Sequence, residues 1–158
     1  MKKSTDALLR IATATPESLP QLLALYEHLA ADNIQMDLDL ATKRLAAFHA
    51  IAGSAVFVGY SAGKLVCSCA LAIIPNLTRG GKPYGLIENV VTHRDYRGLG
   101  FGKQVLSHAI EHAWHHDCYK VMLLTGSQKP ETHAFYRRAG FEASKTGYQI
   151  RRISPRAD

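Results

Sequence analysis

The residues with the clearest chemical potential form a glycine-rich turn, Arg97-Gly98-Leu99-Gly100-Phe101-Gly102, which follows an apolar run and precedes a helical pattern. Such a turn can direct several backbone N–H groups at one point, because glycine has no Cβ to block close approach and readily adopts positive φ. The first turn of a helix adds unpaired N–H donors and a partial positive charge. We therefore expect this turn to bind an anion, and a phosphate group suits it.

Two familiar phosphate-binding loops do not fit the spacing. A Walker loop needs a glycine five residues before the glycine of its Gly-Lys-Ser/Thr, and it needs a hydroxyl after the lysine; Arg97 and Gln104 stand at these positions. A dinucleotide fingerprint that begins at Gly98 would need its third glycine at position 103, which is lysine. What remains is the pattern Arg/Gln-x-x-Gly-x-Gly/Ala. It resembles the pyrophosphate loop of the GNAT superfamily of acetyl-coenzyme A dependent N-acetyltransferases.

A second segment, Phe135-Tyr136-Arg137-Arg138-Ala139-Gly140-Phe141, is similar to the F-Y-x-x-x-G-F segment of the same family. One helix and one strand separate it from the turn, as in the family. Two motifs in the right order arise by chance far more rarely than either motif alone. The resemblance extends over essentially the whole chain, because the order of predicted elements, β-α-α-β-β-β-α-β-α-β-β, is also that of the GNAT core.

These elements must position the two motifs. Apolar periodicity, turn residues and capping signals predict the following strands: 8–13, 55–60, 65–74, 85–91, 120–125, 141–144 and 148–153. Helices are predicted near 16–31, 39–51, 103–116 and 131–139. We expect a single domain over residues 1–158 with an α/β GNAT fold. The resemblance implies a mixed central sheet of six to seven strands, flanked by about four helices, that splays open where two central parallel strands end near Val91 and Thr125.

The resemblance implies that acetyl-coenzyme A is the co-substrate and that no metal is needed. The turn would hold its pyrophosphate, and the strand before the turn would pair with its pantetheine amides and acetyl carbonyl. The expected cofactor-binding residues are Val90, Val91, Thr92, Arg97, Gly98, Leu99, Gly100, Phe101, Gly102, Lys103, Thr132, Phe135 and Tyr136. Thr132 stands where many relatives carry an asparagine, and its hydroxyl could replace that hydrogen bond.

Two side chains are candidates for proton transfer between the amine and the thioester. An alkyl amine with a pKa of about 10.4 is mostly protonated at neutral pH, so a base assists its attack, and the leaving thiol benefits from an acid. The resemblance brings the hydroxyl of Tyr136 near the thioester sulfur, which makes it the candidate acid. A tyrosine that only packs over the cofactor is the alternative.

Glu88 is the candidate base, directly or through water. It is an acid in an otherwise apolar strand, where a carboxylate is unfavourable unless it faces a polar cleft or a partner. A structural salt bridge or a contact with the substrate ammonium remains open. Strand alternation puts Glu88 and Val90 on one face and Asn89 and Val91 on the other. The segment Ile87-Glu88-Asn89 also resembles that of the glucosamine-6-phosphate N-acetyltransferase branch, over too short a stretch to assign the sugar.

The composition is typical of a soluble globular protein, with 47% hydrophobic and 20% charged residues among 158. Nineteen basic and 13 acidic residues give a net charge of +6, which suits a polyanionic ligand such as coenzyme A. The sequence contains no stripe in which basic and aromatic residues alternate, so we expect no nucleic-acid partner. No apolar run reaches the roughly 18 residues of a membrane span, and no signal peptide is evident, so we expect a cytoplasmic protein without membrane contact.

The cysteines and histidines carry no expected chemistry. Cys67, Cys69 and Cys118 are an odd, scattered set, which argues against disulfides and for small core side chains in a reducing compartment. Four histidines follow in the helix, His108, His112, His115 and His116, and the pairs His108/His112 and His112/His116 are four residues apart, as metal ligands on a helix can be. No acidic partner motif from another helix accompanies them. We expect them to lie on a solvated helix face with no metal.

The sequence therefore predicts an N-acetyltransferase that moves an acetyl group from acetyl-coenzyme A to a primary amine, by direct attack in a ternary complex. A small-molecule acceptor is favoured, because the chain carries no peptide-docking appendage. A protein lysine or N-terminus is the alternative acceptor, and a coenzyme A binding sensor without turnover is the alternative of another class. The loops expected to form the acceptor pocket, 34–38 and 76–83, carry no recognisable code. A homodimer that pairs through the edge of the last strands is possible, since relatives are often dimers.

Overall fold

The structure, a computed structural model, describes residues 8–29 and 36–152. Its strands are β1 (Arg10–Thr13), β2 (Ala55–Ser61), β3 (Lys64–Ile74), β4 (Tyr84–Thr92) and β5 (Val121–Leu123). Its α-helices are α1 (Leu19–Tyr26), α2 (Leu38–His49), α3 (Phe101–His115) and α4 (Pro130–Arg138). Short 3-10 turns are η1 (Pro16–Ser18), η2 (Arg79–Gly81) and η3 (Arg94–Tyr96). None of the helices in the described ranges is long and apolar enough to cross a membrane.

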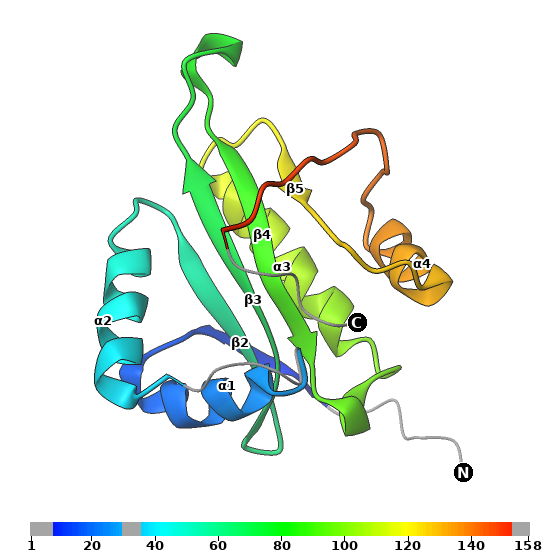
Figure 1. Ribbon diagram of the computed structural model, residues 1–158. Helices are drawn as coiled ribbons and strands as arrows, with labels where there is room; N and C mark the ends of the chain where they lie inside the picture. The colour runs from blue at the N-terminus through cyan, green and yellow to red at the C-terminus, as the bar shows by residue number, and fades with distance from the viewer. Residues whose placement is uncertain (1–7, 30–35, 153–158) are drawn as a thin grey trace.

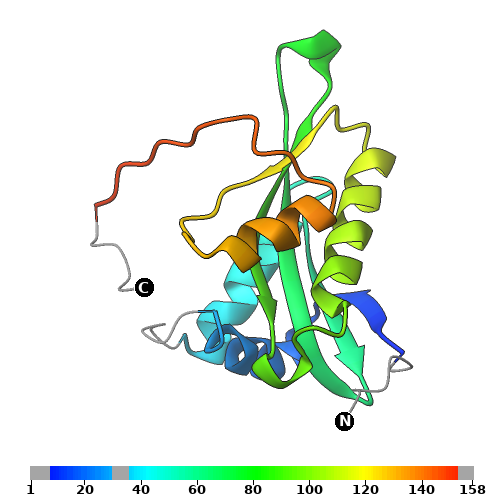
Figure 2. The ribbon, with the colours of Figure 1, turned by 90° about the vertical axis from the view of Figure 1, so that its right-hand side faces the viewer.

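The five strands form one sheet in the order β1-β2-β3-β4-β5. Neighbours are antiparallel except β4 and β5, which run parallel. Helix α3 covers one face of the sheet, and α1 and α2 cover the other (Figures 1 and 2). The sheet is therefore the middle layer of three, and its alternating side chains feed two separate cores.

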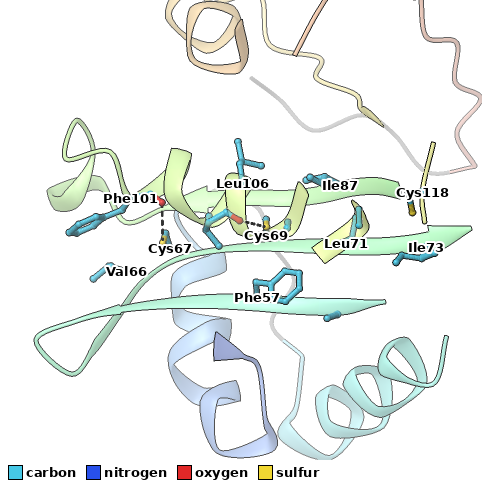
Figure 3. Packing of buried hydrophobic residues seen from close by; sticks show 14 residues of the cluster. Phe57, Val66, Cys67, Cys69, Leu71, Ile73, Ile87, Phe101, Leu106 and Cys118 are labelled. Atoms are coloured by element: carbon cyan, nitrogen blue, oxygen red, sulfur yellow. Dashed lines mark hydrogen bonds between the residues drawn. The ribbon is translucent and has the colours of Figure 1, made fainter. Parts of the chain in front are cut away.

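The sheet separates two cores, and the side chains of β2 alternate between them. The α3-side core includes Phe57, Cys67, Cys69, Leu71, Ile87, Val105 and Leu106 (Figure 3). The α1-side core includes Leu22, Leu25, Leu45, Val56, Val58 and Val91. The expectation that the cysteines are small core side chains is confirmed, because all three are buried and free. The thiols of Cys67 and Cys69 each point at a carbonyl of α3, with sulfur–oxygen distances of 3.7 Å to Phe101 and Val105.

Strands β4 and β5 pair over only three residues each, and beyond this short pairing the two strands separate. Gly85 to Ile87 pair with Val121 to Leu123, and β5 then ends. Strand β4 continues for five more residues to Thr92 without a neighbour on that side. The expected gap between two parallel strands is therefore present, and it exposes the backbone edge of residues 88–92.

The expectation of six to seven strands is wrong for the described residues, which contain five. The segments 141–144 and 148–152 were expected to close the sheet, but the chain from 141 to 152 forms no strand. Their alternating apolar side chains are not buried, since Tyr148 is 93% exposed and Ile150 fully so. Local alternation favours an extended backbone but does not provide a neighbouring strand, and here the segment arches away from the sheet on the side of α1 and α2 (Figures 1 and 2). Residue 153 lies outside the described ranges.

Candidate active site

The glycine-rich turn has the backbone shape that the sequence predicted. Gly98 and Gly100 adopt φ values of +81° and +82°, and Gly100 is the N-cap residue of α3. A Cβ at either position would meet no atom within 4 Å, so the glycines are needed for their backbone conformation, and the outer side of the turn is open. The first helical bond of α3 runs from the N–H of Gln104 to the carbonyl of Gly100. The preceding N–H groups have no partner inside the helix.

Gly102 has a different role, because it is buried. A Cβ there would lie 3.0 Å from the Thr92 hydroxyl oxygen and 3.2 Å from the ring of Phe135. The missing side chain therefore lets the first turn of α3 pack against the ends of β4 and α4. The side chains of Leu99 and Phe101 pack into the α3-side core, so only their backbone groups face the outside of the turn.

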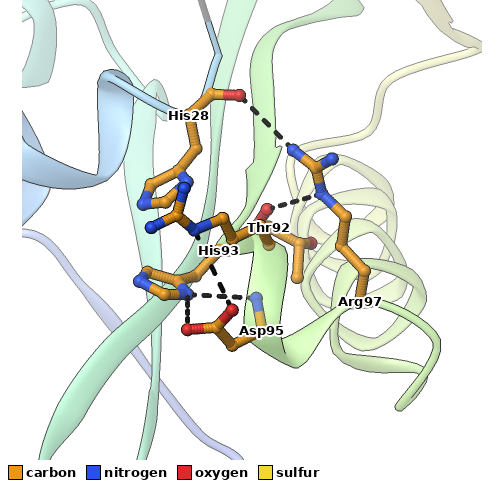
Figure 4. Close-up of polar contacts among 6 residues, drawn as sticks. His28, Thr92, His93, Asp95 and Arg97 are labelled. Atoms are coloured by element: carbon orange, nitrogen blue, oxygen red, sulfur yellow. Dashed lines mark hydrogen bonds and ion pairs between the residues drawn. The ribbon is translucent and has the colours of Figure 1, made fainter.

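The side chain of Arg97 bonds to the protein itself. Its Nε donates to the carbonyl of Thr92 at 3.2 Å, and its Nη2 donates to the carbonyl of His28 at 3.4 Å. Figure 4 shows the guanidinium between these two carbonyls. The His28 ring also lies 4.2 Å from the ring of His93. Arg97 thus ties the end of β4 to the chain just after α1, a contact that sequence patterns did not indicate.

Strand β4 contains a β-bulge at the candidate base. Glu88 pairs with Ala70 and Val91 pairs with Ser68, so three residue steps on β4 face two on β3. Asn89, inside the bulge, has a φ of +52°. Asparagine tolerates this left-handed conformation better than most residues. The bulge leaves backbone groups without a ladder partner.

The bulge also reverses which side chains share a face. Val90 packs against the α3-side core and Val91 packs in the α1-side core, whereas Ile87 lies in the α3-side core. Glu88 therefore shares a face with Val91. The expectation that it shares a face with Val90 is wrong, because strict alternation holds only in the absence of a bulge.

The structure brings Glu88 of β4 and Tyr136 of α4 into electrostatic range. Glu88 is exposed, whereas Tyr136 is half-buried beside Phe135 and Phe141, with ring centroids 5.1 and 6.2 Å away. Burial raises the pKa of Tyr136, and the negative charge of Glu88 raises it further. Tyr136 therefore stays protonated at neutral pH, so its hydroxyl is available as a proton donor.

The side chains of two other expected cofactor-binding residues, Thr132 and Lys103, contact other parts of the protein. The hydroxyl of Thr132, in the first turn of α4, lies 3.2 Å from the hydroxyl of Ser127 and so joins α4 to the loop after β5. The side chain of Lys103 lines a shallow hollow of about 360 Å³ together with Ile11 and Glu111. This hollow lies between α3 and β1, at the opposite edge of the sheet from β5. The backbone of Lys103 is the part that shares the turn.

The histidines of α3 are packed rather than solvated at two positions. His108 and His112 lie edge-on to the ring of Phe57, at 4.8 and 5.1 Å, and the Nε2 atom of His112 is 2.9 Å from the Gly53 carbonyl. The expected solvated face is therefore wrong for these two residues, because Phe57 at the sheet surface reaches their rings. No cluster of three or more His, Cys, Asp or Glu side chains that could hold a metal occurs within residues 8–29 and 36–152.

A family model described as acetyltransferase (GNAT) family matches residues 22–141. The chain belongs to this family. Among solved structures, a candidate acetyltransferase from Agrobacterium tumefaciens strain C58 is 46% identical, with a TM-score of 0.85 over 90% of this chain and 99% of that one. An acetyltransferase of Trypanosoma brucei is 29% identical, with a TM-score of 0.78 over 91% of this chain and 99% of that one.

Curated relatives of this GNAT chain act on an amino sugar. A glucosamine 6-phosphate N-acetyltransferase of Trypanosoma brucei brucei is 41% identical over 88 residues, which are 56% of this chain and 58% of the relative. A glucosamine 6-phosphate N-acetyltransferase of rice, Oryza sativa subsp. japonica, is 33% identical over 79 residues, 50% of this chain and 46% of the relative. The matched part thus spans about half the length of these curated relatives.

Two features of the GNAT site escaped sequence reasoning. The bulge at Asn89 had one local signal, an asparagine inside a β-branched run, because this residue favours positive φ. The bond from Arg97 to the carbonyl of His28 had none, since 69 residues separate the two in sequence.

Proposed function

We propose that this chain is an N-acetyltransferase that transfers the acetyl group of acetyl-coenzyme A to the primary amine of a small molecule by direct attack in a ternary complex. The observation that carries the proposal is the free edge of β4. It begins where β5 ends after Ile87, contains the bulge at Asn89, and leads directly into the glycine turn. A strand edge can pair with amide groups, and the turn that follows it can bind a phosphate, so the two together suit a ligand that carries both.

The residues fit acetyl-coenzyme A in kind and in order. The open side of the turn at Gly98 and Gly100, with the unpaired N–H groups at the start of α3, would hold the pyrophosphate. The backbone of Val90 to Thr92 would pair with the pantetheine amides, and an N–H at the bulge would stabilise a developing oxyanion. Phe135 and Tyr136 would line the far side of the gap. When bound, acetyl-coenzyme A supplies the activated acetyl group.

In this proposal Glu88 and Tyr136 move the protons. Glu88 would take a proton from the ammonium group of the acceptor, directly or through water, and the resulting neutral amine would attack the acetyl carbonyl to form the C–N bond. Tyr136 would give its proton to the sulfur as the C–S bond breaks. The raised pKa of Tyr136 supports this direction of transfer, because the hydroxyl is protonated before the reaction. Cys67 and Cys69 take no part, since burial raises their pKa to about 12.

The names of the curated relatives support an amino sugar phosphate as the first acceptor to test.

The exposed segment 141–152 supports a homodimer. Tyr148 and Ile150 are open, and the outer edge of β5 pairs with no strand of the described residues. A second copy could cover both features. Light scattering should then give twice the chain mass for the wild type and a lower mass after Tyr148→Ser with Ile150→Ser; an unchanged mass for this double variant would contradict the proposed pairing.

The decisive experiment is calorimetric titration with acetyl-coenzyme A, with ATP and NADH as controls that also carry phosphates. Selective binding of acetyl-coenzyme A is expected, followed by thiol release when glucosamine 6-phosphate is added. Equal binding of all three ligands, or no binding of acetyl-coenzyme A, would overturn the proposal. Selective binding without thiol release from any small amine, peptide lysine or peptide N-terminus would instead favour a coenzyme A sensor.

A further inference from the structure

A strip of side chains on β4, on β5 and at the residue before β5 faces away from α3. We call it the acceptor strip, and it consists of Tyr84, Leu86, Glu88, Lys120 and Met122. Its direction follows from the residues between them. A Cβ on Gly85 would lie 3.2 Å from Val121 and 3.6 Å from Ala113 of α3, so Gly85 and Val121 face the helix. Their neighbours Tyr84, Leu86, Lys120 and Met122 face the opposite side.

The middle of the acceptor strip is apolar and belongs to neither core. Leu86 and Met122 are register partners, so their side chains lie next to each other on the same face. Both are half-buried, and neither packs in the α3-side or the α1-side core. Figure 1 shows α1 and α2 over the other part of this face, away from β5. The middle of the acceptor strip is thus an apolar surface next to the part of the sheet that α1 and α2 cover, and it extends to Glu88.

The two ends of the acceptor strip carry opposite charges. Exposed Glu88 stands at one end, and the ammonium group of Lys120 stands at the other, 5.1 Å from the ring of Tyr84. Four residue steps of β4 separate Tyr84 from Glu88, which is about 13 Å along the strand. No carboxylate of the described residues lies within salt-bridge distance of Lys120.

A second cation, Arg79, shares the aromatic neighbour Tyr119 with Lys120. The guanidinium of Arg79 lies 5.9 Å from the ring of Tyr119, and the ammonium of Lys120 lies 5.5 Å from the same ring. The hairpin that carries Arg79 is closed by Asn76, whose side-chain amide donates to the carbonyls of Thr78 and Lys82 at 3.0 and 3.3 Å. Aromatic faces attract both cations but carry no net charge, so the positive charge stays available to a ligand.

We propose that the acceptor strip selects an amine that carries an anionic group, with the amine at Glu88 and the anion at Lys120 and Arg79. This inference rests on the proposed function and adds the residues that determine acceptor specificity. A carboxylate attracts the ammonium form of the amine, Leu86 and Met122 contact the carbon skeleton, and the unpaired cations bind a phosphate or a carboxylate. Lys120 is the specificity residue with the clearest geometry, because its charge is free and its neighbour Tyr84 lies on the strip itself.

Matched acceptors test the proposal by thiol release. The pairs are glucosamine with glucosamine 6-phosphate, and hexylamine with 6-aminohexanoate, so that the phosphate and the carboxylate are examined separately. The wild type should prefer the anionic member of at least one pair. Lys120→Met should lower kcat/KM for that member by about 10- to 100-fold and leave the neutral member within about 2-fold. Lys120→Arg should restore most of the preference, because it keeps the charge.

Lys82→Met is the matched control. Lys82 stands on the hairpin that carries Arg79, but its ammonium group is paired with the Asp117 carboxylate at 3.0 Å. Its replacement should therefore not change the preference for the anionic acceptor. Turnover of both members of each pair with no preference, or a preference that survives Lys120→Met, would overturn the specificity proposal and leave the proposed function standing. Selective binding of acetyl-coenzyme A with no turnover of any of the four amines would overturn the specificity proposal, and the proposed function also fails if no other small amine releases thiol. Thermal melting of each variant checks that a lost preference is not caused by unfolding.

Discussion

Replacing Tyr136 with phenylalanine tests the proposed acid with little structural disturbance. The ring would keep its contacts with Phe135 and Phe141, which lie at 5.1 and 6.2 Å. The structure gives the hydroxyl no hydrogen-bond partner within the described residues, so the substitution breaks no internal bond. We therefore expect the free energy of unfolding to stay within about 1 kcal/mol of the wild-type value.

The rate should change much more than the stability. A positioned general acid contributes roughly 10²- to 10⁴-fold. The lower end applies here, because a thiol with a reference pKa of about 8.5 is already a fair leaving group. A fall of about 100-fold in kcat corresponds to about 2.7 kcal/mol of transition-state stabilisation, at about 1.36 kcal/mol for each tenfold.

The assay combines thiol release at saturating substrates with titration of acetyl-coenzyme A. Tyr136→Phe should lower kcat about 100-fold and leave the affinity for acetyl-coenzyme A unchanged. In the wild type, the raised pKa of Tyr136 also predicts no loss of activity from its ionisation below about pH 10. Equal kcat values for the two proteins would refute the role of Tyr136 as acid. Loss of affinity together with rate would assign it to cofactor binding instead.

Three further predictions concern other residues. Glu88→Gln removes the charge but keeps the shape, and it should lower kcat/KM for the amine about 100-fold at neutral pH, with a smaller deficit at higher pH where more amine is unprotonated; an unchanged value would exclude a base at Glu88. Cys67 and Cys69 should not react with a thiol reagent in the folded protein, because both are buried with pKa values of about 12, and both should react in urea; rapid labelling of the native protein would contradict the packing. Burial lowers the pKa of His112, so folding favours its neutral form, and the free energy of unfolding should fall as pH drops below about 6.5. Denaturant titrations should show a smaller fall for His112→Asn, and an equal fall in the two proteins would contradict the assignment.

Short-range patterns predicted most of the elements within a few residues. The glycine turn and α3 were predictable because their signals are local, with positive-φ glycines, a helix start and one apolar stripe, all within residues 97–115. The buried strands β2 and β3 followed from their β-branched and apolar composition. The segment 141–152 shows the limit of this reasoning. Its alternation is as regular as that of a strand, but a strand also needs a neighbour, and sequence alternation contains no information about one.

The site divides in the same way. The sequence by itself determined the family, the glycine-rich turn and the presence of Glu88 and Tyr136, because each depends on residue type at short spacing. Only the tertiary structure decided that the bulge at Asn89 turns Glu88 to the face of Val91, and that Lys120 and Tyr84 stand at the other end of that face. Backbone register and the parting of β4 from β5 set these positions, and both arise from contacts between segments far apart in the chain.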